Sequence, residues 1–418
     1  MEWQQTRLLA PRVQIRLSEV VAMRSAITRR VLGSWALGTI ACGCFAPTIV
    51  DPDVLATTPS VFAQFANPPV GIAVSPGGRT FVSFSRALDE QAPYSLGELV
   101  AGTPVLYPPG FQQDLGDPAD DRLLSVQAIT FDGLGRLWIL DSGKVGQQPI
   151  RPGTPKLVAI DLRTNEVVRR LVLPPEIAGP TAMISDVRID LTHGSAGTAF
   201  LTDASSEGPN GLIVIDLGRG TMMRRLGDHP SMRPEPNLVT SCEGQPLIIR
   251  QGSKAGTPFR AGVDGVALDA DGHHLYYRPL TSRHLYRVNT DGLVDPNWTD
   301  LEIAGTIEDL GDLGFASDGL LEDTAGRLFL TDYEHNSIWR LDDGRLELIA
   351  QSSTLLWPDT MSLGPDGKLV CTASQLERSP RLRGTDETFR PFTVWQIATD
   401  SRPLYLGGEE PEPRGLGR

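Results

Sequence analysis

The stretch SDGLLEDTAGRLFLTD (317–332) contains an aspartate, a short apolar strand, a turn with a glycine and a second apolar strand. The same pattern returns along the chain, which indicates a repeat architecture. The other copies are VGIAVSPGGRTFVSF (70–84), VQAITFDGLGRLWILD (126–141), SDVRIDLTHGSAGTAFLTD (185–203), VDGVALDADGHHLYYRP (263–279) and PDTMSLGPDGKLVCTA (358–373). Each copy has a turn glycine that can supply the positive φ of a tight hairpin, namely Gly78, Gly135, Gly197, Gly272, Gly326 and Gly367.

Most copies are followed by a second pair of strands. These pairs are LVAIDLRTNEVVRRLVL (157–173), LIVIDLGRGTMMRRL (212–226), HLYRVNTDGLVD (284–295), SIWRLDDGRLELI (337–349) and TVWQIATDSRPLYL (393–406). Four strands in about 40–45 residues are typical of one propeller blade. The sequence therefore predicts an all-β fold, a six-bladed β-propeller with four-stranded antiparallel blades around a central channel. A β-sandwich is the main alternative, but it does not explain the repeat.

The repeats place the propeller at residues 57–408, between an N-terminal segment and a polar tail, 409–418. Residues 227–260 form a Pro-rich insertion between blades 3 and 4, with the expected strand pair LVTSC/PLIIR. An open ring would leave unpaired sheet edges that invite aggregation. We therefore expect SVFAQFA (60–66) to add a strand to the C-terminal blade and close the ring.

The overall charge argues against one class of partner. The chain has 418 residues and a formal net charge of −13, whereas a nucleic-acid-binding protein needs a basic surface. We expect a monomer with a small-molecule partner and no nucleic acid. Cys42 and Cys44 belong to the N-terminal segment, and the sequence does not decide whether Cys242 and Cys371 pair.

Residues 1–56 predict export. Basic residues up to Arg29 and Arg30 precede VLGSWALGTIACGCFAPTIV (31–50), which has no charge, as in a secretory signal. The pair also resembles a twin-arginine motif, although Gly33 departs from it. Cleavage would follow Ala46 or Ala56; alternatively, Cys42 ends a lipobox-like triplet and carries a lipid anchor, or the segment stays as an uncleaved membrane anchor. The predicted location is periplasmic or extracellular, with membrane contact only through the signal or the anchor.

Alignment of the copies points to one group of polar residues. It places Gln127, Asp186, Asp264, Asp318 and Asp359 at the same position near the start of the first strand. First strands line the channel of a propeller, so these side chains should converge at one mouth. Converging carboxylates repel one another unless they are protonated or neutralised by a cation.

The sequence therefore predicts a Ca²⁺ or Mg²⁺ site formed by Asp186, Asp264, Asp318 and Asp359, because hard cations prefer oxygen ligands. A structural interpretation is also open, in which each aspartate caps its own strand or accepts backbone N–H bonds between blades. A site for a cationic ligand is the remaining interpretation.

Other residues give weaker signals. Asp141, Asp203 and Asp332 follow the second strands and are interpreted as turn or cap residues. His335, in DYEHNS (332–337), either faces the channel mouth as a ligand-binding residue or turns the chain. The sequence contains no G-x-S-x-G, H-E-x-x-H, P-loop or G-x-G-x-x-G motif.

At several of these phrases the chain resembles the major royal jelly and yellow protein family. They are RLWILDSG (136–143), SDVRID (185–190), GLIVIDL (211–217), DGVALDADGHHLYYRPLTSRHLYRV (264–288) and FLTDYEHNSIWR (329–340). The resemblance implies a secreted six-bladed propeller, since family members are secreted. Some insect members bind small aromatic amines in the channel, and others are linked to dopachrome conversion.

The chain is more distantly similar to gluconolactonase-type propellers, in which Glu, Asn and Asp hold a divalent metal in the channel. That similarity implies Asp264 or Asp318 as a general base. However, PPVGIAVS (68–75) lacks the expected glutamate, and no asparagine occupies the aligned channel positions.

We therefore predict a propeller that binds a small polar or aromatic molecule at the channel mouth, with a divalent cation as the expected cofactor. The predicted ligand-binding residues are Gln127, Asp186, Asp264, Asp318, Asp359 and His335. The alternative is an enzyme, either a metal-dependent lactone hydrolase or a dopachrome-type tautomerase, with Asp264 and Asp318 as catalytic residues. A protein-interaction scaffold is a third hypothesis.

Overall fold

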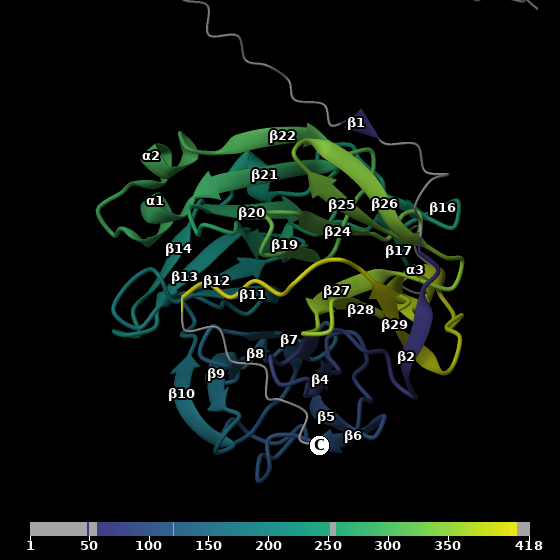
Figure 1. The fold of residues 1–418 in the computed structure, drawn as a ribbon, viewed down its shortest axis with the longest axis horizontal. Helices are drawn as coiled ribbons and strands as arrows, with labels where there is room; N and C mark the ends of the chain where they lie inside the picture. The colour runs from purple at the N-terminus through teal and green to yellow at the C-terminus, as the bar shows by residue number, and fades with distance from the viewer. Residues whose placement is uncertain (1–47, 50–56, 120, 251–255, 408–418) are drawn as a thin grey trace, which may run out of the picture. The chain divides into compact units, whose positions relative to one another are not determined.

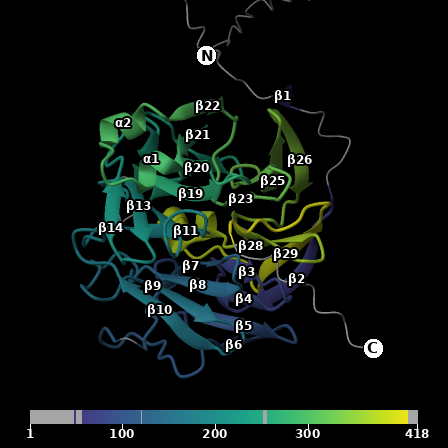
Figure 2. The same cartoon turned by 60° about the vertical axis from the view of Figure 1, so that its left-hand side comes forward.

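The computed structural model describes residues 48–49, 57–119, 121–250 and 256–407. Within these residues the strands form six antiparallel blades of four strands, arranged in a ring (Figures 1 and 2). The prediction of an all-β, six-bladed propeller is therefore confirmed.

The first three blades follow the repeat in chain order. Blade 1 contains β3 (Ile72–Val74), β4 (Thr80–Ser83), β5 (Leu96–Val100) and β6 (Thr103–Leu106). Blade 2 contains β7 (Val126–Phe131), β8 (Arg136–Asp141), β9 (Lys156–Asp161) and β10 (Glu166–Val172). Blade 3 contains β11 (Ile184–Asp190), β12 (Thr198–Asp203), β13 (Gly211–Asp216) and β14 (Met222–Arg225).

The other three blades depart slightly from a simple repeat. Blade 4 contains β19 (Val263–Leu268), β20 (His274–Pro279), β21 (His284–Asn289) and β22 (Glu308–Asp312). Blade 5 contains β23 (Leu320–Glu322), β24 (Leu328–Asp332), β25 (Ser337–Asp342) and β26 (Arg345–Gln351), and the short β1 (Thr48–Ile49) pairs in parallel with β26. Blade 6 contains β27 (Pro358–Leu363), β28 (Lys368–Ala373), β29 (Phe392–Ala398) and β2 (Ser60–Phe65).

The ring is closed by a strand from the other end of the chain. β2 pairs antiparallel with β29, with Ser60 opposite Gln396 and Phe65 opposite Phe392. The expectation that residues 60–66 complete the C-terminal blade is confirmed.

Two predicted strand pairs are wrong in their second halves. Within 284–295 only β21 is a strand, because the Asn289 side chain accepts a hydrogen bond from the Gly292 N–H and starts helix α1 (Thr290–Val294). Helix α2 (Asp300–Ala304) follows before β22. Within 393–406 only β29 is a strand, since β2 already occupies its free edge.

The chain after β29 instead crosses the channel, as the yellow segment in Figure 1 shows. Isolated bridges join Pro403 to Asp323 of blade 5 and Leu406 to Asp190 of blade 3. Residues Pro403–Leu406 line a small cavity of about 80 Å³ together with first-strand residues of all six blades. The C-terminal segment therefore covers this end of the channel.

The described residues of the insertion 227–260 contain two short antiparallel strand pairs and a turn of 3₁₀-helix, η1 (Pro230–Met232). β15 (Ser241–Cys242) pairs with β16 (Gln245–Pro246), and β17 (Ile248–Ile249) pairs with β18 (Thr257–Pro258). In the predicted pair LVTSC/PLIIR, only Ser241 and Pro246 are opposite each other. Ile248 and Ile249 pair with β18 instead.

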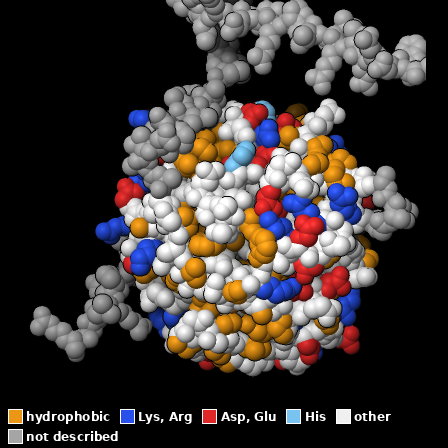
Figure 3. All heavy atoms as spheres, turned by 90° about the vertical axis from the view of Figure 1, so that its right-hand side faces the viewer, with side chains coloured by type: hydrophobic (Ala, Val, Ile, Leu, Met, Phe, Trp, Pro, Cys, Tyr) orange, Lys and Arg blue, Asp and Glu red, His pale blue; other side chains and the backbone are white. Residues whose placement is uncertain are grey.

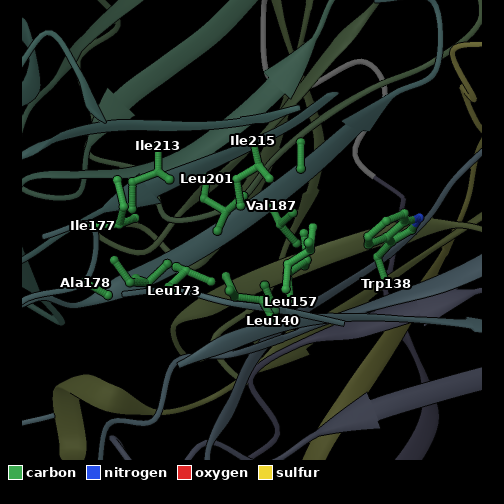
Figure 4. Packing of buried hydrophobic residues seen from close by; sticks show 14 of the residues in the cluster. Trp138, Leu140, Leu157, Leu173, Ile177, Ala178, Val187, Leu201, Ile213 and Ile215 are labelled. Atoms are coloured by element: carbon green, nitrogen blue, oxygen red, sulfur yellow. The ribbon is translucent and has the colours of Figure 1, made fainter. Parts of the chain in front are cut away.

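Apolar side chains fill the spaces between neighbouring blades. Figure 4 shows the cluster between blades 2 and 3, where Trp138, Leu140 and Leu157 face Val187, Leu201, Ile213 and Ile215. Similar clusters join each further pair of neighbours around the ring. Dense packing between blades makes the ring rigid, so that loops at the channel mouths are held at fixed positions.

Several predictions from the N-terminal segment lie outside the described residues. These are the basic cluster, the cleavage points, Cys42 and Cys44; the tail 409–418 lies outside them as well. No helix in the described part of the chain has the length and apolarity that a membrane crossing requires.

Cys242 and Cys371 are both buried and free. On the face shown in Figure 3, acidic and basic side chains are intermingled rather than separated by sign.

Candidate functional site

The uncovered mouth of the channel holds a cavity of about 170 Å³. Residues at the starts of the first strands form its floor, namely Val70, Gln127, Asp186, Asp264, Asp318 and Asp359. The alignment of the repeats therefore brought together the residues that lie together in space. We refer to Asp186, Asp264, Asp318 and Asp359 as the aspartate ring.

A shared irregularity turns these side chains toward the channel. In blades 2, 3, 4 and 6 the pairing of the first and second strands shifts register at the position of the aligned residue. The shift at Gln127, for example, lies between Val126 and Ala128. A β-bulge of this kind bends the strand and re-aims a side chain.

Glycine and threonine hold the bulges together. Gly265 follows Asp264, and a Cβ built on it would lie 2.1 Å from the backbone oxygen of Asp318 in the next blade. The Thr202 hydroxyl accepts a hydrogen bond from the Asp186 N–H at 3.0 Å and donates one to the Asp264 backbone oxygen at 2.7 Å. At the same second-strand position in blades 5 and 6, the Thr331 hydroxyl accepts from the Asp318 N–H and the Thr372 hydroxyl accepts from the Thr360 N–H.

This set of threonines was missed by the sequence analysis. Its signal was present in the repeated endings FLTD (200–203), FLTD (329–332) and VCTA (370–373). The threonine hydroxyls satisfy backbone groups that the bulges remove from the strand ladders.

Asp186 differs from the rest of the ring because it has a cationic partner. Its carboxylate accepts a hydrogen bond from Arg188 at 2.7 Å and another from the Val187 N–H at 2.8 Å. Burial raises the pKa of Asp186, and the nearby Arg188 charge opposes that increase. Asp186 and Arg188 therefore form a local ion pair at the edge of the ring.

The other three members have no ion pair within the part of the chain that the structure describes. Burial raises the pKa of Asp318 to about 7, while a hydrogen bond from the Trp357 indole at 2.7 Å opposes the increase. Burial and the charges of neighbouring ring members raise the pKa of Asp264 and of Asp359 well above the usual range. At neutral pH the ring therefore holds protons unless a cation enters the cavity.

The geometry of the ring bears on the predicted metal site. Calcium takes six to eight oxygen ligands at about 2.3–2.6 Å, so three ligands of one ion lie close together. Among the described residues, no three ring members place carboxylate oxygens within 4.8 Å of one another. In this arrangement the ring does not form a coordination shell, and Ca²⁺ or Mg²⁺ binding stays a prediction. Within the described part of the chain, the ligand atoms that do lie this close together belong to Asp269, Asp271 and His274, around the β19–β20 turn.

Basic side chains also line the cavity. They are Lys144, Arg188, Arg260 and Arg381. Lys144 follows β8 of blade 2, whereas Arg381 lies in the short helix α3 (Pro380–Arg383) between β28 and β29. None of the four was predicted, because Lys144, Arg260 and Arg381 lie outside the aligned first strands.

Two segments form the upper wall of the cavity. One is Phe259–Ala261, at the end of the insertion, and the other includes Leu376 and Arg381 of the β28–β29 loop. Polar contacts join the two: the Arg250 N–H donates to the Arg381 backbone oxygen at 2.8 Å, and Arg378 pairs with Glu243 at 2.5 Å. The insertion and the long loop therefore shape the cavity together.

His335 does not line this cavity. Its Nδ1 lies 2.9 Å from the Asp332 carboxylate, its N–H donates to the same group, and its side chain is 55% exposed. The structure therefore places His335 in the turn after β24 and not at the channel mouth. Asp141, Asp203 and Asp332 are buried and accept hydrogen bonds from nearby backbone N–H groups, which confirms their interpretation as cap residues.

Comparisons with known proteins agree with the fold. The family profile described as "Major royal jelly protein" matches residues 124–378, which is more than half of the chain. The chain belongs to the major royal jelly protein family. The resemblance expected from the sequence is therefore confirmed.

The relatives match over part of their length. Major royal jelly protein 5 of Apis mellifera is 31% identical over 173 residues, which are 40% of this chain and 26% of that protein. Yellow-related salivary protein SP03 of Phlebotomus perniciosus is 26% identical, over 60% of this chain and 66% of that protein. Protein yellow of Drosophila guanche is 27% identical, over 56% of this chain and 41% of that protein. The matched region thus spans well under half of the royal jelly protein and of protein yellow.

Solved structures include propellers of the gluconolactonase type, as the sequence suggested. A calcium-binding regucalcin from Agrobacterium tumefaciens is 13% identical and has a TM-score of 0.49, over 84% of this chain and 99% of that one. A putative gluconolactonase is also 13% identical with a TM-score of 0.49, over 83% of this chain and 94% of that one. Likeness at this level carries no statement about function.

Proposed function

We propose that this chain is an exported binding protein that holds a small polar or aromatic molecule in the cavity at the mouth of the propeller channel. The observation that carries the proposal is the meeting of four aspartates in one cavity of about 170 Å³. Three of them lack an ion pair within the described residues, so the cavity favours a ligand with a positive charge.

The rest of the cavity supports a ligand with an apolar part. Leu88, Phe259, Leu280 and Leu376 line it together with the polar residues. Ligand sites in proteins commonly combine apolar walls with a few converging polar groups. A cavity of about 150 Å³ can enclose a benzene ring, so this one has room for a single aromatic ring.

The names of the relatives are compatible with this proposal. They include a yellow-related salivary protein and several royal jelly proteins, which points to secretion of those proteins. The aromatic amines implied by the family resemblance carry the positive charge and the apolar ring for which the cavity has complementary groups.

A second candidate function is proton transfer within a bound aromatic molecule, as in a tautomerase. Asp318 faces the cavity, its position is fixed by the Trp357 indole, and its pKa of about 7 suits a group that gains and loses a proton at neutral pH. A metal-dependent lactone hydrolase has less support, because the ring carboxylates are not arranged as a coordination shell.

The test of the binding proposal is titration calorimetry with a panel of small amines, phenols and sugars. We expect amines to bind and Asp264→Asn with Asp318→Asn to weaken that binding at least tenfold. Asp366→Asn is the matched control, because Asp366 is 56% exposed in the β27–β28 turn. If no panel member binds the wild type, or if the double variant binds as tightly, the proposal is wrong.

Export needs a separate test. Replacement of Arg29 and Arg30 by lysine should block a twin-arginine route and barely change a general secretory route. Cell fractionation of the wild type and this variant measures the result. Recovery of the wild type in the cytosol would contradict the export proposal.

A further inference from the structure

We propose that the cavity is built for a zwitterion of the α-amino acid class, whose carboxylate binds Lys144 and Arg381 and whose ammonium group faces the aspartate ring. The inference rests on the proposed function, since it takes the same cavity as the ligand site. It adds a second, negative charge to the ligand and names the residues that recognise it.

Two of the four basic side chains in the cavity are already satisfied. Arg188 pairs with Asp186 at 2.7 Å. Arg260 donates to the backbone oxygens of Pro234 and Glu235 at 3.2 and 3.3 Å. Arg188 therefore has a counter-charge within the protein, and the Arg260 guanidinium has hydrogen-bond acceptors there.

The remaining two, Lys144 and Arg381, have no such partners. Within the described chain neither side chain forms an ion pair or donates a hydrogen bond, and the guanidinium carbon of Arg381 lies 5.7 Å from the centre of the Phe259 ring. Both are partly buried. Burial and then the Arg381 charge lower the pKa of Lys144, so the two cations lie near enough to repel each other.

Besides the Asp186–Arg188 pair, the cavity is therefore lined by carboxyl groups and by cations that form no ion pairs with each other. Asp264, Asp318 and Asp359 have no cationic partner, and Lys144 and Arg381 have no anionic one, among the residues that the structure describes. Partly buried charges without partners are costly. A ligand with one positive and one negative group neutralises both sets, whereas an amine alone leaves the cations unpaired.

Arginine is suited to the expected contact, because its planar guanidinium binds a carboxylate through two parallel hydrogen bonds. Phe259 lines the cavity with its ring centre 5.7 Å from this guanidinium carbon, so an aromatic or aliphatic side chain of the ligand can pack beside it.

The test compares three probes that differ only in charge: L-phenylalanine, phenethylamine, which lacks the carboxylate, and 3-phenylpropanoate, which lacks the ammonium group. Calorimetric titration of the full chain should give at least tenfold tighter binding for L-phenylalanine than for either other probe. Arg381→Met and Lys144→Met should each remove most of that preference and leave phenethylamine binding unchanged or slightly tighter.

The control variants are Arg163→Met, whose side chain is 79% exposed, and Lys368→Met, at 48% exposed. Both should bind the three probes as the wild type does, and thermal unfolding checks that the Arg381 and Lys144 variants are folded. Equal binding of phenethylamine and L-phenylalanine by the wild type would overturn the inference and leave the proposed function intact. Unchanged L-phenylalanine binding by both cavity variants, or no binding of any of the three probes, would also overturn it. In the latter case the titration of amines, phenols and sugars tests the proposed function separately.

Discussion

Two sets of buried aspartates in this propeller differ in what surrounds their carboxylates. Asp141, Asp203 and Asp332, at the ends of second strands, accept hydrogen bonds from the protein itself; Asp141 accepts from the Leu124 and Ser125 N–H groups at 2.7 and 2.8 Å. Each also has a basic neighbour, such as Arg224 at 2.8 Å from Asp203. Three members of the aspartate ring have no ion pair among the described residues, although they are the same residue type in the same repeats. The two sets therefore differ in whether the protein supplies a basic partner: the strand-end carboxylates have one, and three ring carboxyls have none among the described residues.

The largest expected effect on stability comes from the strand-end aspartates, of which Asp141 is the clearest case. Asp141→Ala removes the acceptor for three backbone N–H groups, those of Leu124, Ser125 and Gly143. It also leaves the buried Lys156, 3.6 Å away, without its counter-charge. We expect a loss of about 3–5 kcal/mol in the free energy of unfolding, measured with urea. Asp366→Ala, at an exposed turn, should change it by less than about 0.5 kcal/mol. A loss below about 1 kcal/mol for Asp141→Ala would show that this carboxylate does not stabilise the fold.

Replacement of Asp318, in contrast, should increase the free energy of unfolding at high pH. Its pKa in the folded state is about 7, above the value of about 3.9 for an unfolded aspartate, so the folded state binds more protons between these values. Stability should therefore fall as pH rises from 4 to 7, and Asp318→Asn should be more stable than the wild type at pH 8 by about 2–4 kcal/mol. The advantage should vanish near pH 4. An asparagine variant that is less stable at pH 8 would show that the carboxylate has a structural role.

The same titration should control ligand binding. As pH rises from 6 to 8 the Asp318 carboxyl loses its proton, and the negative charge of the ring increases. Amine affinity should rise about tenfold, which corresponds to about 1.4 kcal/mol. Calorimetry of phenethylamine at both pH values measures it. In Asp318→Asn the affinity should change little with pH, and an equal rise in that variant would assign the effect to another group.

The smallest effect is expected from divalent cations. Because no three ring carboxylates among the described residues lie within 4.8 Å of one another, no ready-made coordination shell stabilises the folded state. Millimolar Ca²⁺, or a chelator, should shift the midpoint of thermal unfolding by less than about 1 °C. A larger shift that Asp264→Asn abolishes would instead support the predicted metal site.

The sequence predicted the positions of the ring because the repeat is regular in the first strands. One alignment placed Gln127, Asp264 and the other members at a shared channel position, and all of them line the cavity. The alignment alone did not show which aspartates are paired. The sequence does hold a signal for it, because Arg188 follows Asp186 by two residues and no basic residue stands there in the other blades.

The unpredicted parts of the site come from segments outside the repeat. Lys144 and Arg381 belong to connections of different length in blades 2 and 6, so no aligned position marks them. The missing fourth strand in 399–406 has a different cause. β2 occupies the edge of β29 that a strand there would need, and residues Pro403–Leu406 cover one end of the channel instead.

The pairing of β2 with β29 also constrains how the protein is made. Ser60 and Gln396 are opposite each other in one sheet but lie at opposite ends of the folded chain. The last blade therefore cannot form before β29 has been synthesised, and the ring stays open until then. Contacts between such distant residues are slow to form, because the entropy of closing a long loop is lost before the contacts contribute any favourable free energy. Any partner that keeps the nascent chain soluble must therefore protect an open ring until its final strand is complete.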